Sequence, residues 1–316
     1  MASGWQPPYT MNIAHEQLHC ATSVGEALDL VAAALDAADL CYGHGTDNPW
    51  DEAVQLVLAV VGLPADSDNS ALPHPVTREQ AVRMASLLHT RIEDRVPLPY
   101  LTGKAFFAGL PLRCDPRAII PRSPIAELVL AGFQPWYAGP GPERILDLCC
   151  GGGCIGLASA WYLPDARVDL LDLDSEALSL AAENVTDLGL EARVRVLQSD
   201  LFAAVDGERY DIIVCNPPYV DADDLAAMPP EYHHEPGLAL GSGADGLDLT
   251  RRLLQAAEDY LQPSGLLVVE VGNSQEALEL AFPTVPFTWL EFEHGGHGVF
   301  ALTARELREN RSSLRG

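Results

Sequence analysis

The first third of the chain places apolar residues at the spacing of helices. Ser23 can cap a helix that runs to Leu40, Pro49 stands at the start of a run to Val61, and Thr77 can cap a third run. Between the last two runs, residues 64–76 are rich in proline and aspartate and predict a loop. The pattern predicts a small helical domain over residues 12–95, preceded by a frayed tail at 1–11. Its expected core positions are Val24, Leu28, Val31 and Leu35 in the first helix and Val82, Ala85, Leu88 and Ile92 in the third.

Residues 96–123 follow a different pattern. Five prolines exclude a long helix, and short apolar stretches lie at Tyr100–Leu101, Phe106–Phe107 and Ala118–Ile120. Stretches of this length are typical of hairpin strands. We therefore expect a hairpin connector over 96–123, followed by a helix that Ser123 caps and Pro124 begins.

From residue 144 onward, short apolar runs alternate with helical runs. Strands are predicted at 144–149, 167–172, 193–198, 210–215, 265–271, 288–293 and 298–302, and helices at 154–163, 175–188, 248–262 and 274–281. This alternation is typical of a parallel sheet covered by helices on both faces, here an α/β domain over 124–305. Only His294–His297 separates the last two strands, so these two are expected to form an antiparallel hairpin.

The net charge of the chain limits the classes of partner that it is expected to bind. The 316 residues, enough for about two domains, carry 19 basic and 45 acidic side chains, a net charge of −26. Such a surface should repel duplex nucleic acid, whose binding depends on Lys and Arg that neutralise phosphates. It should attract a basic protein, although the charge could equally serve solubility. Only the segment 96–142 is net positive, with Lys104, Arg113, Arg117 and Arg122 against Asp115 and Glu127.

Cysteine usage and hydropathy indicate the compartment. The seven cysteines are scattered, with no Cys-x-x-Cys pair, so we expect neither a disulfide framework nor a metal site. The N-terminal residues lack a basic-then-apolar signal pattern, and no apolar run approaches the roughly 18 residues of a membrane span. A cytoplasmic protein without membrane contact is expected.

The first element that carries chemistry is a glycine cluster between a predicted strand and a predicted helix. It reads Arg144-Ile-Leu-Asp-Leu-Cys-Cys-Gly-Gly-Gly-Cys-Ile-Gly156. Gly151 and Gly153 allow the backbone to approach a ligand closely, and the helix that follows offers free N–H groups. A glycine-rich turn can also serve only to let strand and helix pack together, so this element alone is a weak signal for a cofactor.

Two acidic residues end the next two predicted strands. Asp172 follows the glycines by about 20 residues, the spacing at which an acidic side chain meets ribose hydroxyls in nucleotide-binding folds. The alternative is that Asp172 only caps the next helix, which is the role we expect for Asp174 and Ser175. Asp200 closes the third strand and could accept a hydrogen bond from an adenine amino group or could be an ordinary turn residue.

The third element is Asn216-Pro-Pro-Tyr219, directly after the predicted strand 210–215. Two prolines stop the strand and stiffen the loop. The Asn216 side-chain carbonyl and the Pro217 backbone carbonyl can together accept both hydrogens of an NH₂ group. Tyr219 offers a flat face to a planar group. After the fourth strand of this pattern, the tetrapeptide is a strong signal.

Together the three elements resemble those of class I S-adenosylmethionine-dependent methyltransferases, whose fold is a Rossmann-like, seven-stranded, mostly parallel sheet. Asn-Pro-Pro-Tyr resembles the element of enzymes that methylate planar NH₂ groups, either exocyclic amines of nucleobases or glutamine amides. With its helical N-terminal domain and hairpin connector, the chain resembles the protein glutamine methyltransferases of the Prm/Hem family over residues 12–305. The segments that resemble the branch acting on a large-subunit ribosomal protein are Ile120-Pro-Arg-Ser-Pro-Ile125, Asp147-Leu-Cys, Glu231-Tyr-His-His-Glu-Pro236, Gly246-Leu-Asp-Leu-Thr250, Glu270-Val-Gly-Asn273 and Phe287-Thr-Trp-Leu-Glu-Phe292.

The resemblance implies S-adenosylmethionine as cofactor and methyl transfer to a glutamine side-chain amide nitrogen. A basic large-subunit ribosomal protein would be the substrate, the helical domain would recognise it, and no metal or nucleic acid would take part. The resemblance assigns catalysis to Asn216, Pro217, Pro218 and Tyr219, and cofactor binding to Asp147, Cys149, Gly151, Gly153, Asp172, Asp200 and Asn216. Cys149 stands at the first glycine of the superfamily pattern, which puts a positive-φ turn there in doubt; with no basic neighbour in sequence, we expect it to pack rather than to attack.

Three alternatives stay open. The release-factor branch of the same family is the nearest, although an acidic residue near Ser123–Ile125 would be expected of it. A DNA adenine-amine methyltransferase shares Asn-Pro-Pro-Tyr, but the net charge of −26 and the lack of a basic recognition segment argue against it. A catalytically silent scaffold with this fold would not need an intact Asn216–Tyr219 element.

Overall fold

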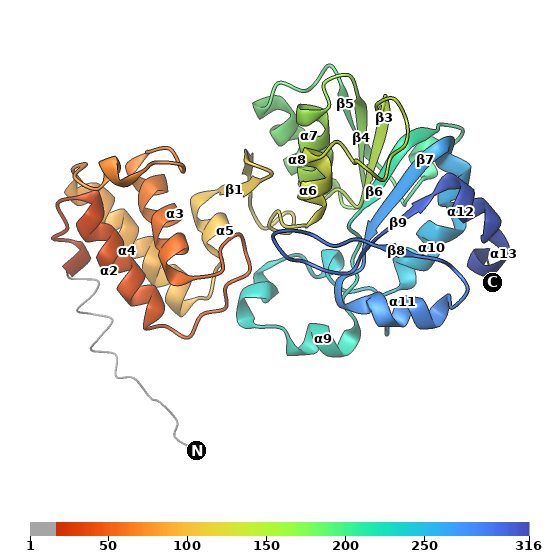
Figure 1. Cartoon of the computed structure of the whole chain (residues 1–316). Helices are drawn as coiled ribbons and strands as arrows, with labels where there is room; N and C mark the ends of the chain where they lie inside the picture. Colours follow the sequence, from red (N-terminus) through yellow and green to blue (C-terminus); the bar gives the residue numbers. More distant parts are fainter. Residues whose placement is uncertain (1–16, 316) are drawn as a thin grey trace. The chain divides into compact units, whose positions relative to one another are not determined.

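A computed structural model describes residues 17–315, so the tail predicted at 1–11 lies outside the described residues (Figure 1). The chain divides into two compact units. One holds the described residues through Gly103 together with the short segment Pro229–His234, and the other holds Lys104–Met228 and the residues from Glu235 onward. The hairpin connector thus divides between them, with its strands in the second unit.

The helical unit contains α2 (Val24–Asp36), α3 (Pro49–Val61), α4 (Arg78–Glu93) and the short α5 (Leu98–Thr102). Each of the first three helices begins where a side chain caps it. Ser23 accepts from the backbone N–H of Glu26, Asn48 from that of Asp51, and Thr77 forms a reciprocal capping box with Gln80. The three predicted helices are confirmed, with the first ending four residues early.

Two sequence predictions in this unit are wrong. Val82 is 46% exposed, because the buried stripe of α4 runs through Ala81, Met84, Ala85 and Leu88 and ends in Arg91. The prediction is confirmed for Ala85 and Leu88, which are buried, and an apolar pattern does not recognise an arginine as a core residue. Tyr100–Leu101 lies in helix α5 and not in a strand, since Pro99 occupies the first helical turn, where a missing N–H costs little.

The second unit opens with a two-stranded antiparallel hairpin of β1 (Lys104–Phe107) and β2 (Leu110–Arg113), as predicted at Phe106–Phe107. Ala118–Ile120 forms no strand but an irregular segment after a turn. Helix α6 (Ile125–Leu130) begins one residue later than predicted, and the Ser123 hydroxyl accepts a hydrogen bond of 3.1 Å from the Ile125 N–H.

The main sheet has seven strands in the order β5-β4-β3-β6-β7-β9-β8. Its parallel strands are β3 (Arg144–Leu148), β4 (Arg167–Asp172), β5 (Val194–Gln198), β6 (Tyr210–Cys215) and β7 (Leu261–Glu270). The last two, β8 (Thr288–Trp289) and β9 (Val299–Thr303), pair antiparallel, as predicted, and β9 runs antiparallel to β7. All seven predicted strands are confirmed; the largest differences are the early start of β7 and the shortness of β8.

Helices cover both faces of this sheet (Figure 1). On one face lie α6, α7 (Cys154–Tyr162) and α8 (Ser175–Asp187), and on the other α10 (Asp248–Ala256), α11 (Gln275–Ala281), α12 (Ala304–Glu309) and α13 (Arg311–Arg315). Successive strand residues point to opposite faces, so Ile145 joins the first core and Leu146 the second. The short helices α9 (Ala222–Ala227), α12 and α13 were not predicted. None of the helices in residues 17–315 has the length and apolar character that a membrane crossing requires.

Candidate active site

The predicted site residues converge at one edge of the sheet. Strand order reverses between β4 and β6, which flank β3, and ligands of open parallel sheets bind outside the carboxyl ends of the strands at such a point. Leu148, at the end of β3, pairs with Leu171 on one side and Cys215 on the other. The residues just beyond these ends therefore lie together around a cavity of about 320 Å³. Of the predicted site residues, it is lined by Cys149, Gly151, Asp172, Asp200, Asn216 and Pro218.

The turn after β3 takes a left-handed backbone three times. Cys149 has φ 56°, Gly151 φ 52° and Gly153 φ 85°. The positive-φ turn that the cysteine put in doubt is present, although a side chain is strained there. Gly151 lines the cavity, whereas Gly153 does not. A Cβ on Gly153 would lie 3.0 Å from a Leu170 methyl group, so this glycine serves the packing of helix against strand.

Asp172 both shapes the turn and faces the cavity. Its carboxylate accepts a 2.8 Å hydrogen bond from the Gly151 N–H and a 2.9 Å bond from the Asp174 N–H. Asp174 is the cap of α8, as predicted. Burial raises the pKa of Asp172, and these backbone bonds partly offset the effect. The residue thus ties the glycine turn to the end of β4 and presents an acceptor to a ligand.

Asp147 lies beneath the glycine turn rather than on the cavity wall. It is 1% exposed and its Oδ2 accepts a 2.7 Å hydrogen bond from the Gly156 N–H at the start of α7. Its Oδ1 is buried and has no hydrogen-bond partner among the described residues. Burial raises its pKa to about 7. A buried acid of this kind next to a cavity is typical of functional sites.

Asp200 carries a partner that the sequence did not reveal. The Arg252 guanidinium on α10 donates to both Asp200 oxygens at 2.8 Å, and both side chains are about half exposed. Arg252 itself lines the cavity. The two residues are 52 positions apart, so no local pattern pairs them.

Asn216 and Tyr219 occupy different positions in the site. Asn216 is half-buried at the cavity wall, and its side-chain amide has no hydrogen-bond partner among residues 17–315. Pro217 is buried, and Tyr219 lies outside the lining residues. The Tyr219 hydroxyl donates to the Glu270 carboxylate at 3.1 Å, and its backbone carbonyl accepts from the Ser274 hydroxyl at 2.8 Å. Glu270 and Ser274 are residues that the sequence did not place in the site.

The segment after Tyr219 supplies a further wall. Pro236, Leu238, Ala239 and residues 241–243 line the cavity. Glu235 anchors this wall: it accepts a 2.9 Å hydrogen bond from the Ile120 N–H and a 2.6 Å bond from the Arg122 guanidinium. The connector contributes three more lining residues, Arg117, Ala118 and Ile119. The stretch Ala118–Ile120, predicted as a strand, instead places two of its residues at the cavity.

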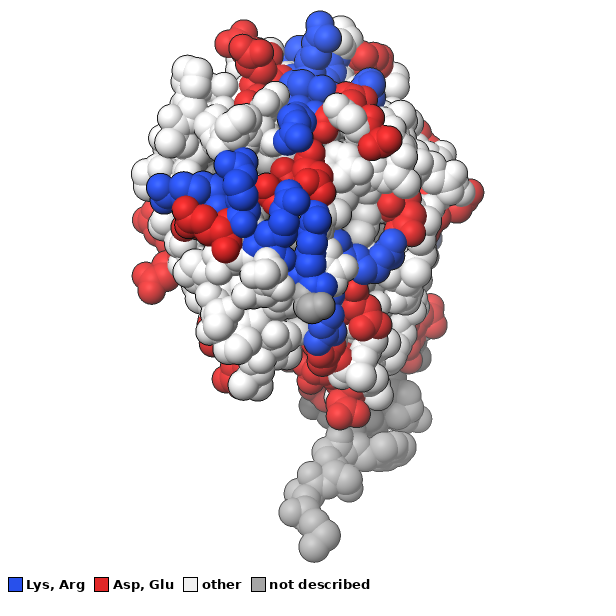
Figure 2. All heavy atoms as spheres, turned by 90° about the vertical axis from the view of Figure 1, so that its right-hand side faces the viewer, with Lys and Arg blue, Asp and Glu red and all other residues white. Residues whose placement is uncertain are grey.

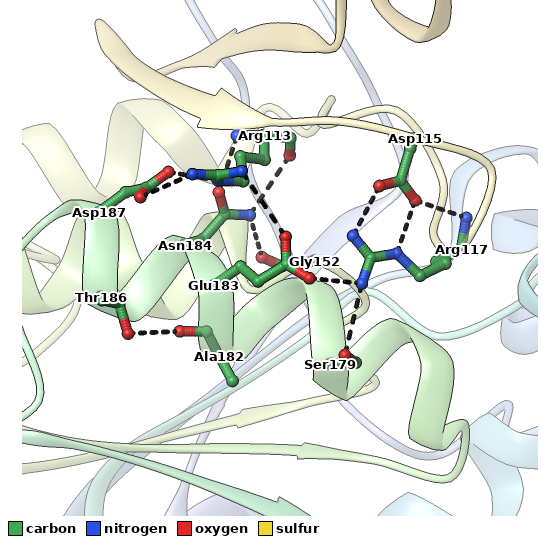
Figure 3. A network of polar contacts seen from close by, with 10 residues as sticks. All are labelled: Arg113, Asp115, Arg117, Gly152, Ser179, Ala182, Glu183, Asn184, Thr186 and Asp187. Carbon is green, nitrogen blue, oxygen red and sulfur yellow. Dashed lines mark hydrogen bonds and ion pairs between the residues drawn. The ribbon is translucent and has the colours of Figure 1, made fainter.

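A polar network joins the connector to helix α8 beneath the glycine turn (Figure 3). Asn184, 1% exposed, accepts from the Arg113 N–H at 2.7 Å and donates to the Gly152 carbonyl at 3.0 Å. Arg117 donates to Glu183 on the same helix at 2.7 Å (Figure 3). The glycine turn and the connector are thus held by one helix face.

The strand order, the switch point and the cavity define a class I S-adenosylmethionine-dependent methyltransferase fold. The family model of the methyltransferase small domain matches residues 136–228. A ribosomal protein uL3 glutamine methyltransferase of Francisella tularensis subsp. tularensis is 45% identical over 86% of this chain and 87% of its own length. One from Bordetella pertussis is 44% identical over 86% of this chain and 92% of its own. The chain belongs to the family of ribosomal protein uL3 glutamine methyltransferases.

Similarity to solved structures is weaker. A methyltransferase from Pyrococcus furiosus matches with a TM-score of 0.45 and 18% identity, over 62% of this chain and 89% of its own.

Proposed function

We propose that this chain transfers a methyl group from S-adenosylmethionine to the side-chain amide nitrogen of a glutamine in ribosomal protein uL3. The observation that carries the proposal is the free Asn216 amide, half-buried at the wall of a cavity whose other walls hold the glycine turn and Asp172. The two relatives, at 44% and 45% identity, support the choice of uL3.

The residues around the cavity suit the proposed cofactor. Its ribose hydroxyls and adenine amine are hydrogen-bond donors, and Asp172 and Asp200 offer carboxylate acceptors at the ends of neighbouring strands. Leu173 and Leu201 give apolar surface between them for a flat ring. Gly151 leaves the backbone accessible to the amino-acid end. When bound, S-adenosylmethionine supplies an electrophilic methyl group on a sulfonium sulfur.

The chain's own residues would act on the substrate amide by placing it. An amide nitrogen is a poor nucleophile because its lone pair is delocalised into the carbonyl. The Asn216 side-chain carbonyl and the Pro217 carbonyl would accept its two hydrogens, and the Tyr219 ring would fix its plane. Orientation and polarisation by preorganised acceptors can supply much of such a barrier reduction. The amide proton can leave after the transfer, so no strong base is required.

Partner and compartment follow from the same proposal. A basic ribosomal protein suits a chain of net charge −26. The helical unit would recognise this protein, and the cytoplasm is where such a substrate is made. The acidic surface also disfavours the DNA adenine-amine alternative, while the release-factor branch remains the rival to test.

The test is methyl transfer by the purified protein. With labelled cofactor and separate uL3, release-factor and DNA substrates, we expect label only on a glutamine of uL3. Label only on DNA or only on the release factor would contradict the proposal.

A variant tests the role of Asn216. We expect Asn216→Ala to lower kcat by about 100-fold or more, because the amide loses an oriented acceptor. The affinity for the cofactor, measured by calorimetry, should stay within about twofold, since Asp172 and the glycine turn are untouched. Asn310→Ala, at the end of α12, is the matched control and should turn over as the unaltered protein does. Unchanged turnover of Asn216→Ala would refute the role.

A further inference from the structure

Glu270 is a buried acid that lies beside the Asn-Pro-Pro-Tyr element without lining the cavity. It ends β7 and is 6% exposed. Strands β6 and β7 run parallel, with Cys215 opposite Val269, so Glu270 comes next in register to Asn216. A carboxylate removed from water is costly unless donors satisfy it. Here two hydroxyls do so: Ser123 donates to Oε2 at 2.6 Å and Tyr219 donates to Oε1 at 3.1 Å.

Further contacts of Tyr219 come from two residues that follow Glu270 in the chain and from Gly246. Gly272 has φ 47°, and a Cβ there would lie 2.5 Å from a carbon of the Tyr219 ring. Ser274 donates its hydroxyl to the Tyr219 carbonyl at 2.8 Å. Gly246, with φ 73°, approaches the same carbonyl so closely that a Cβ would lie 2.1 Å from it. The ring face, the hydroxyl and the backbone of Tyr219 are therefore each held by a separate contact.

These contacts give Glu270 a specific part in the arrangement. The glycine at 272 only clears space beside the ring, and Ser274 holds only the backbone. The hydroxyl bond to Glu270 is a contact at the far end of the ring and resists its rotation away from the present orientation. Ser123 fixes the carboxylate in turn, and its own hydroxyl also accepts from the Ile125 N–H at 3.1 Å, so the anchor is tied to the start of α6.

We propose that Glu270 is a positioning residue for methyl transfer, which acts through the Tyr219 hydroxyl to set the ring face against which the substrate amide lies. This inference rests on the proposed function of the Asn216–Tyr219 element. Glu270 itself touches Ser123 and Tyr219 and not the cavity, so it acts through the tyrosine. Misplacement of a reacting group by about 1 Å can cost about 100-fold in rate, so loss of such an anchor should appear in kcat.

A second tyrosine–carboxylate pair in the same sheet provides a matched control. The Tyr210 hydroxyl donates to Asp169 at 2.7 Å, and Asp169 is 4% exposed. This pair has the same tyrosine–carboxylate hydrogen bond and similar burial, but it belongs to the opposite end of the strands, away from the cavity. Asp169 also forms an ion pair with Arg195 at 2.6 Å, so its substitution measures the structural cost of losing a buried carboxylate far from the site.

The experiment is a double-mutant cycle on purified full-length protein, with wild type first shown to methylate uL3. We expect Glu270→Leu and Tyr219→Phe each to lower kcat about tenfold or more, with the Kd for cofactor and for uL3 within about twofold. In the Tyr219→Phe background, Glu270→Leu should cause no further loss, because its route of action is already gone. Glu270→Gln keeps an acceptor for the tyrosine and should restore kcat to within about threefold of wild type. Asp169→Asn should lower the melting temperature and leave kcat unchanged below it.

Several outcomes overturn the inference while the proposed function stands, since wild-type activity is measured separately. The first is a kcat of Glu270→Leu that equals that of wild type. The second is a kcat of the double variant that is reduced by the product of the two single effects. If Glu270→Leu does not fold, Tyr219→Phe alone decides: wild-type kcat in that variant excludes the hydroxyl anchor.

Discussion

At the scale of single residues, the site is marked by carboxylates that the fold buries beside a cavity. Asp147, Asp172 and Glu270 all have a pKa raised by burial. Ionisation of such a buried carboxyl lowers the stability of the folded protein, and groups with shifted pKa values cluster at functional sites. Their hydrogen-bond partners differ, so their roles can be separated by substitution.

Asp147 gives the clearest dependence on pH. Its pKa is raised from 3.8 to about 7 in the folded protein, so between these values the folded state binds more protons than the unfolded state. The free energy of unfolding should therefore fall as the pH rises through this window. Relative to Asp147→Asn, which cannot titrate, wild type should lose about 1.4 kcal/mol per pH unit at most. Denaturant unfolding of both proteins without cofactor, between about pH 4 and pH 7, measures it; a pH-independent difference would contradict the assignment.

Asp172 should govern affinity for the cofactor. Asp172→Asn removes the charged acceptor proposed for the ribose hydroxyls, and a hydrogen bond to a charged group contributes about 1.5–3 kcal/mol. We expect the cofactor Kd to rise by about tenfold or more in calorimetry. Asp221→Asn, which preserves the cap of α9 and lies outside the cavity lining, should leave Kd unchanged. Equal Kd values for Asp172→Asn and wild type would remove Asp172 from the cofactor site.

At the scale of elements, periodicity and capping predicted most of the fold. All seven strands of the main sheet coincide with short apolar runs in the sequence. Ser23, Asn48 and Thr77 each cap the N-terminus of a helix. These signals depend only on neighbouring residues, so they can be recognised without a structure. The wrong predictions arise at residue types that usually have another role. Arg91 is charged but completes the buried stripe of α4, and Pro99 lies in the first turn of helix α5.

The site residues that could be predicted are those whose position depends only on neighbouring sequence. Asp172 and Asn216 follow strands directly, and both reach the cavity. Glu270 is hydrogen-bonded to Ser123, 147 residues away in the chain, and Arg252 to Asp200, 52 residues away. Such pairs depend on strand order and register, which spacing along the chain does not encode. Gly153 belongs to the same motif but lies outside the cavity lining and packs closely against Leu170, so its role in cofactor binding stays a prediction.

Helix α8 should transmit the state of the connector to the glycine turn. Asn184 links the Arg113 backbone to the Gly152 carbonyl (Figure 3). Asn184→Ala leaves buried backbone groups unpaired, at about 1–3 kcal/mol each. We expect lower stability and a cofactor Kd raised about fivefold or more, both measured on the purified variant. Thr186→Ala, whose hydroxyl bonds only within the exposed side of the same helix, should change neither by much. A normal Kd in Asn184→Ala would leave the network without influence on the turn.

At the scale of the whole molecule, the excess of acid is broken by arginines on one face of the second unit. Figure 2 shows basic and acidic side chains interleaved on the face that carries α12 and α13. Several of these arginines are already paired, Arg308 with Glu258 and Arg315 with Asp259. Neighbouring carboxylates therefore neutralise part of the positive charge on this face.

Salt distinguishes steering from solubility as the use of this charge. The Debye length shrinks from about 8 Å at 0.15 M to about 3 Å at 1 M salt. If the acidic surface attracts a basic substrate, kcat/KM toward intact uL3 should fall at least several-fold over this range, while the cofactor Kd stays the same. A short glutamine peptide without basic residues, used as control substrate, should lose little. Equal salt responses of protein and peptide would assign the charge to solubility.

The central claim is that this chain methylates a glutamine of uL3, and mass spectrometry of cellular proteins tests it most directly. Ribosomal proteins and release factors are compared between a strain that carries the gene and one that lacks it, with the gene restored as wild type or as Asn216→Ala. The account predicts that uL3 alone becomes lighter by one methyl group on one glutamine in the deletion strain, and that only the wild-type gene restores it. An unchanged uL3, or a methyl group lost from a release factor instead, would contradict the account.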